Sequence, residues 1–230
     1  MASIAIIGQD GSGKSTISNM LLENLNLPLK YLYMGRNVES GKFNLPTSKL
    51  IYYLKIYEYK KKNKIKEFDK AKKLSLHDLD KDRKKDTRGH IGAFLRLTSR
   101  LLEEWFRLII SWYYQSRGFI VLYDRHFIFD YAVDPEKQDL SKLRLTERIH
   151  LWTLNHLYEK PSLVVFLNAP GTVLFARKGE ASVDYIDQKN KLFERIGSTM
   201  PNFIIIDASQ PVEIVYENII KKITTLLPLN

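Results

Sequence analysis

The chain contains no cysteine among its 230 residues, and this absence removes several kinds of chemistry. A disulfide framework, a thiolate zinc site and a cysteine nucleophile are all excluded. Because cysteine-free chains suit a reducing compartment, we expect a cytoplasmic protein. Any catalysis must use other side chains.

Long apolar runs and acidic residues are also scarce. No stretch is long enough to predict a membrane span, and the opening MASIAIIG lacks the basic segment of a signal peptide. Asp and Glu number 26 against 36 Lys and Arg, which leaves a net charge of +10. That charge implies attraction to anions, whether nucleotides, nucleic acid or an anionic membrane surface.

Short apolar runs bounded by glycine, proline or polar residues predict five buried strands, at residues 3–7, 29–34, 119–123, 163–167 and 203–206. Helical patterns separate them, notably at residues 15–25, 94–116, 143–158, 172–177, 183–196 and 212–226. Apolar strands that alternate with helices are typical of a parallel sheet covered on both faces. We therefore expect an α/β fold with one domain over residues 1–230.

The segment GQDGSGKS, residues 8–15, matches the phosphate-binding pattern G-x-x-x-x-G-K-[ST] and lies between a predicted strand and a predicted helix. Lys14 can bridge the β- and γ-phosphates of a nucleotide, and the Ser15 hydroxyl can bind Mg²⁺. The loop is predicted to hold ATP through Gly8, Asp10, Gly11, Ser12, Gly13, Lys14, Ser15 and Thr16.

A second candidate anchor, Asp124-Arg125-His126, follows the strand at residues 119–123. Ligands of parallel α/β sheets bind at this end of the strands. Asp124 can hold Mg²⁺ and Arg125 can clamp phosphate oxygens. In the alternative interpretation, Asp124 caps the next segment and Arg125 pairs with it.

Two further regions each allow two interpretations. Arg177 and Lys178 precede Gly179, so they belong either to a lid at about 178–185 that closes over the phosphates or to an ordinary helix C-terminus. Residues 55–73 contain nine lysines, which form either a solvated helical face or a binding surface for an anionic acceptor, nucleic acid or an anionic membrane.

The motifs together resemble the thymidylate kinase family of P-loop nucleoside monophosphate kinases. The loop matches that family's G-x-[DE]-G-x-G-K-[ST]-T, Asp124-Arg125-His126 matches its D-R-[YH], and residues 206–211 read IDASQP as its C-terminal motif does. The resemblance implies a three-layer fold with a five-stranded parallel sheet and transfer of the γ-phosphoryl group of Mg-ATP to dTMP. It leaves a homodimer open, since relatives often dimerise, and it implies an adenine site between Arg177 and the segment Ser209, Gln210 and Pro211.

The same resemblance assigns catalysis to Asp10, Lys14, Arg125, Arg177 and Lys178. It is weakest on the acceptor side, where residues 37–92 have no family counterpart. Arg36 stands where the family has R-E-P, and Glu103 replaces an arginine. The acceptor contacts we expect are Asp10, Arg36, Arg100 and Arg125. A sugar, a glycan terminus or a phosphorylated metabolite stays open as the acceptor, and so does a nucleotide-dependent binding protein without catalysis.

Overall fold

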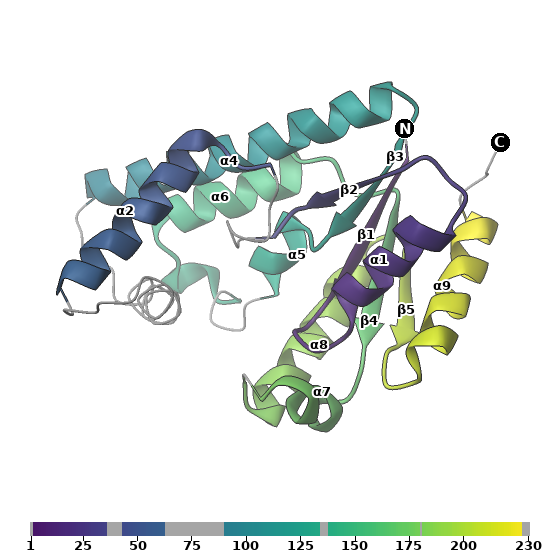
Figure 1. The fold of residues 1–230 in the computed structure, drawn as a ribbon. Coiled ribbons are helices and arrows are strands. Elements are labelled where there is room, and N and C mark those ends of the chain that lie inside the picture. Colours follow the sequence, from purple (N-terminus) through teal and green to yellow (C-terminus); the bar gives the residue numbers. More distant parts are fainter. Residues whose placement is uncertain (1, 36–42, 63–89, 134–137, 180, 227–230) are drawn as a thin grey trace.

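The computed structural model describes residues 2–35, 43–62, 90–133, 138–179 and 181–226 (Figure 1). Arg36 and most of the lysine-rich stretch, from residue 63 onward, lie outside the described residues. Over the part of the chain that is described, no helix combines the length and apolarity that a bilayer crossing requires.

Five parallel strands form one sheet, and this confirms the predicted fold class. The order across the sheet is β2-β3-β1-β4-β5. Each strand begins and ends within one or two residues of its expected position, as β1 Ser3–Gly8, β2 Leu29–Tyr33, β3 Ile120–Asp124, β4 Leu163–Asn168 and β5 Phe203–Asp207.

Helices connect these strands and extend the acceptor side: α1 Lys14–Asn24, α2 Pro46–Lys62, α4 His90–Ser116, α5 Phe127–Ala132, α6 Leu145–His156, α7 Gly171–Lys178, α8 Val183–Gly197 and α9 Val212–Leu226. The sequence analysis did not predict α5, because six residues are too few to show a helical period. His126 caps this helix by accepting a hydrogen bond from the Ile128 N–H.

Alternate residues of the strands face opposite layers, as the two-residue period of a strand requires. On β1, Ile4 and Ile6 pack on the face that α1 and α9 cover. Ala5 and Ile7 pack on the other face, beneath α4, α5, α6 and α8. Figure 1 shows α1 and α9 on one side of the sheet and α4 and α6 on the other. Since both faces are covered, the interior positions of the central strands β1, β3 and β4 are largely apolar, whereas the edge strand β2 carries the exposed Lys30.

The central position of β1 decides where a ligand can bind. It lies between β3 and β4, and Ile6 of β1 is opposite Asp124 of β3. The loop that follows β1 therefore emerges beside the end of β3. A crevice outside the carboxyl ends of the strands is the usual ligand site of such sheets.

The core beneath α8 supplies a test of the packing. Phe166 is 0% exposed and stacks on Phe193 with ring centroids 4.8 Å apart. We expect Phe166→Ala to lower the free energy of unfolding by about 3–5 kcal/mol, because it leaves a cavity between the sheet and α8. Urea denaturation measures this loss. In the matched control, Phe94→Ala at a 60% exposed position, the change should stay within about 0.5 kcal/mol, and equal losses would contradict the packing.

Candidate active site

The glycine loop adopts backbone conformations that residues with a Cβ atom rarely adopt. Gly8 has φ 148°, and a Cβ on it would lie 2.7 Å from the Leu167 carbonyl oxygen. Gly13, with φ 88°, is the N-cap of α1, so Lys14 begins the helix. The unpaired N–H groups at this helix start attract anions. The loop thus has the strand, turn and helix that phosphate binding requires.

Lys14 is held inside the loop without full charge compensation. Its side chain is 6% exposed, Nζ donates to the Gln9 carbonyl oxygen at 2.6 Å, and the Asp10 carboxylate is 3.9 Å away. Burial lowers the pKa of Lys14 to about 8, and the nearby Arg125 adds to this shift against the opposing pull of Asp10, Asp124 and Asp130. A phosphate group beside Nζ would favour the charged form of this buried lysine.

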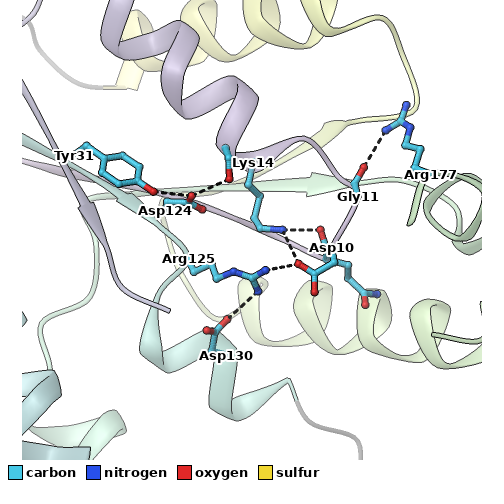
Figure 2. Close-up of polar contacts among 10 residues, drawn as sticks. Asp10, Gly11, Lys14, Tyr31, Asp124, Arg125, Asp130 and Arg177 are labelled. Carbon is cyan, nitrogen blue, oxygen red and sulfur yellow. Dashed lines mark hydrogen bonds and ion pairs between the residues drawn. The ribbon is translucent and has the colours of Figure 1, made fainter. Parts of the chain in front are cut away.

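Asp124 carries the best candidate ligand for a divalent cation. The side chain is buried, and its Oδ2 accepts hydrogen bonds from Ser15 Oγ at 3.1 Å and Tyr31 OH at 2.9 Å (Figure 2). Within the described residues Oδ1 has no hydrogen-bond partner. A buried carboxylate oxygen without a donor, beside a hydroxyl, suits a hard cation such as Mg²⁺. These residues therefore fit a magnesium–nucleotide complex.

Tyr31 was absent from the sequence predictions. Burial raises the pKa of its hydroxyl, and the Asp124 carboxylate raises it further, so the group stays a proton donor. No local pattern could have revealed it, because it reaches Asp124 only through the pairing of β2 with β3.

Arg125 occupies a strained backbone position. With φ 68° it is the one non-glycine residue at positive φ in the part of the chain that the structure describes. Its guanidinium donates to Asp10 Oδ1 and lies 3.9 Å from Asp130 Oδ1 (Figure 2). Strain of this kind concentrates at functional sites. Arg125 therefore joins the loop to α5 instead of pairing with Asp124.

The charges around this arginine are mutually compensated. Burial opposes ionisation of Asp10, but Arg125, Lys14 and Lys178 hold the pKa of its carboxyl below the usual value. The pKa of Arg125 is raised, because the carboxylates of Asp130 and Asp10 outweigh the effect of burial. In contrast, burial lowers the pKa of His126 to about 3, so this histidine is neutral and acts as a helix cap.

The expected lid residues lie beside the loop. Arg177 Nη1 donates to the Ala208 carbonyl oxygen at 2.9 Å and lies 3.4 Å from that of Gly11. Lys178 ends α7, and Gly179 with φ 65° caps it. The contact of Arg177 with the loop agrees with the lid interpretation, and the Gly179 cap agrees with an ordinary helix C-terminus. Closure of the segment stays a prediction.

The expected adenine side is a tight turn after β5. Asp207 Oδ1 accepts hydrogen bonds from the N–H and hydroxyl of Ser209, at 2.9 and 2.6 Å, and Oδ2 accepts one from Gln210 at 3.1 Å. Pro211 then precedes α9. Arg177 links this turn to the glycine loop, because its guanidinium contacts the carbonyl oxygens of both Ala208 and Gly11.

On the expected acceptor side, polar residues of α4 pack against the end of β2. Arg107 is 2% exposed and donates to the Gly35 carbonyl oxygen at 2.6 Å and to Asn44 Oδ1 at 2.7 Å. Glu103 pairs with it at 3.0 Å and accepts a hydrogen bond from the Leu45 N–H. Arg100 lies over the Tyr131 ring, 5.5 Å from its centroid. The structure therefore brings Asp10, Lys14, Ser15, Asp124 and Arg125 together but places Arg100 against α5.

Fold and site together define a class. A glycine loop that buries its lysine beside a hydroxyl and a carboxylate, at the carboxyl edge of a parallel sheet, is how P-loop phosphotransferases hold a nucleotide. The chain is a kinase-type phosphotransferase of this class.

A relative of known name is similar to the chain over nearly its whole length. No family model matches the chain. A thymidylate kinase from Thermosipho melanesiensis is 27% identical over 233 residues, which cover 97% of this chain and 98% of the relative. Over nearly its whole length the chain is thus similar to a P-loop nucleoside monophosphate kinase, and kinases of that type generally use ATP with Mg²⁺.

Solved structures share the fold. Two structures of deoxyadenosine kinase from M. mycoides, one with dCMP and a flexible dCDP and one with dCTP, are 18% and 19% identical. Each aligns with a TM-score of 0.52 over 97% of this chain and 99% of theirs.

The buried charge of Lys14 predicts a pH dependence. Below about pH 8 the lysine is protonated in both the folded and the unfolded chain, so the full cost of burying the charge is present. Between about pH 8 and 10.5 the folded chain loses this proton first, and the free energy of unfolding of the wild type rises.

Lys14→Met should therefore be more stable than the wild type by roughly 3 kcal/mol near neutral pH, and the difference should vanish near pH 10.5. Urea denaturation of both proteins across this range checks it. A difference that does not change with pH would contradict the buried charge.

Proposed function

We propose that the protein transfers the γ-phosphoryl group of Mg-ATP to a nucleoside monophosphate, with dTMP as the first candidate. The observation that carries the proposal is the meeting of Lys14, the Ser15–Asp124 pair and Arg125 at one edge of the sheet. The thymidylate kinase relative, which spans nearly the whole chain, supports this choice of acceptor.

Each of these residues has a distinct task in the proposed reaction. The ammonium of Lys14 and the N–H groups of the loop bind the phosphates of the donor. Ser15 and Asp124 hold Mg²⁺, which when bound offsets phosphate charge. Arg125, oriented by Asp10 and Asp130, offers its remaining donors to phosphate oxygens and stabilises the charge that develops during transfer.

ADP formation from Mg-ATP tests this function. The panel holds dTMP, the other nucleoside monophosphates, deoxynucleosides, sugars and sugar phosphates, with Lys14→Met as the blank. We expect dTMP to stimulate ADP formation and Lys14→Met to reduce it by on the order of 100-fold or more, because a charge that stabilises the transition state is lost. The proposal is wrong if every monophosphate leaves ADP formation at background.

A second candidate keeps the donor site and uses a hydroxyl of a sugar, a glycan terminus or a phosphorylated metabolite as the acceptor. Two carboxylates flank Arg125, which donates to Asp10 and lies 3.9 Å from Asp130. They offset its charge and favour a neutral hydroxyl over a phosphate dianion. Glu103 and Arg107, which occupy the acceptor-side helix, are engaged with each other.

Asp130→Asn separates the two candidates by the direction of its effect. If the acceptor is a monophosphate, removing this negative charge should lower its KM, by roughly 3- to 10-fold. If the acceptor hydroxyl depends on the carboxylate, the KM should rise by about 10-fold. Steady-state kinetics with the acceptor found in the panel give the answer, and Asp139→Asn, at an exposed carboxylate that bonds Ser141, should leave KM unchanged.

A further inference from the structure

Tyr31 reaches the candidate metal ligand from the neighbouring strand. In the parallel pairing of β2 with β3, Tyr31 lies opposite Leu122, two residues before Asp124. Leu122 and Asp124 therefore point to the same face of the sheet, which is the face that α1 covers. The Ser15 hydroxyl reaches Asp124 from the start of α1, so Tyr31 and Ser15 converge on one carboxylate from two elements.

The two oxygens of this carboxylate have unequal surroundings. Oδ2 accepts both hydrogen bonds, from Tyr31 OH at 2.9 Å and Ser15 Oγ at 3.1 Å. Oδ1 has no partner among the described residues, although Asp124 is 3% exposed. The terminal torsion of aspartate is soft and nearly two-fold. Without a donor that distinguishes the oxygens, the carboxylate could turn and present either one.

Of the two donors, Tyr31 is the one that can keep this orientation throughout the reaction. Ser15 is itself a candidate metal ligand, so its hydroxyl oxygen must also serve the cation. The tyrosine hydroxyl is neutral, and it orients Asp124 without compensating the negative charge that attracts the cation. A lysine or arginine in its place would compete with the metal.

We propose that Tyr31 is a positioning residue for the divalent cation: it holds Asp124 Oδ2 and thereby presents Oδ1 to the ion beside Ser15. The inference rests on the proposed function, since it assumes that the nucleotide binds together with a metal. Partners that orient a metal-binding carboxylate typically change metal affinity or activity by 10- to 100-fold when they are removed.

Tyr31→Phe tests the inference, with Tyr123→Phe as the matched control. Tyr123 is a buried tyrosine on β3 whose hydroxyl bonds Ser111 Oγ at 2.6 Å, on the opposite face of the sheet. Calorimetry gives the affinity for ADP with Mg²⁺ and with EDTA, and electron paramagnetic resonance gives the affinity of the protein–ADP complex for Mn²⁺.

We expect Tyr31→Phe to weaken Mn²⁺ binding by about 10-fold or more and to remove most of the gain in ADP affinity that Mg²⁺ provides. Its ADP affinity in EDTA should stay within about twofold of the wild type, because the loop is unchanged. Tyr123→Phe should leave both metal measurements at wild-type values.

The opposite results separate two kinds of failure. If the wild type responds to Mg²⁺ and Tyr31→Phe responds equally, with only a lower melting temperature like that of Tyr123→Phe, the hydroxyl has a structural role and this inference is overturned alone. If ADP binding by the wild type is indifferent to Mg²⁺, the proposed donor site is wrong and the inference falls with it.

Discussion

The parallel pairing of β1 with β3 is the constraint on which the site depends. Ile6 lies opposite Asp124, so the glycine loop that begins at Gly8 emerges next to the carboxylate that ends β3. Hydrogen bonds of the ladder set this register, and the apolar residues on both faces of the strands hold it. A slip of one residue would turn Asp124 toward the opposite layer of helices, away from Ser15.

The electrostatics of the site follow from that proximity. Lys14 and Arg125 are cations brought together by the loop and β3, and Asp10 lies between them. The carboxylates of Asp130 and Asp10 raise the pKa of Arg125, whereas burial lowers the pKa of Lys14 despite three nearby carboxylates. A buried cation at the start of a helix is the arrangement on which the proposed phosphate binding depends.

Away from the glycine loop, the charged residues Glu103 and Arg107 of α4 serve packing. Arg107 donates hydrogen bonds to the carbonyl oxygen of Gly35 and to Asn44, and these bonds connect α4 to the end of β2. Glu103 serves the same junction. These positions of α4 therefore serve packing, although the loop and the D-R-H motif match the pattern of thymidylate kinase-like kinases.

The sequence by itself determined the five strands, most of the helices, the phosphate-binding loop and the resemblance to a kinase family, because each is written in a contiguous run of residues. Only the tertiary structure decided that Tyr31 bonds Asp124 across 93 positions of the chain, and that Arg125 bonds Asp10 across 115. It also decided that Arg107 packs against β2. These contacts arise when distant strands and helices meet, and no local period or spacing records such a meeting.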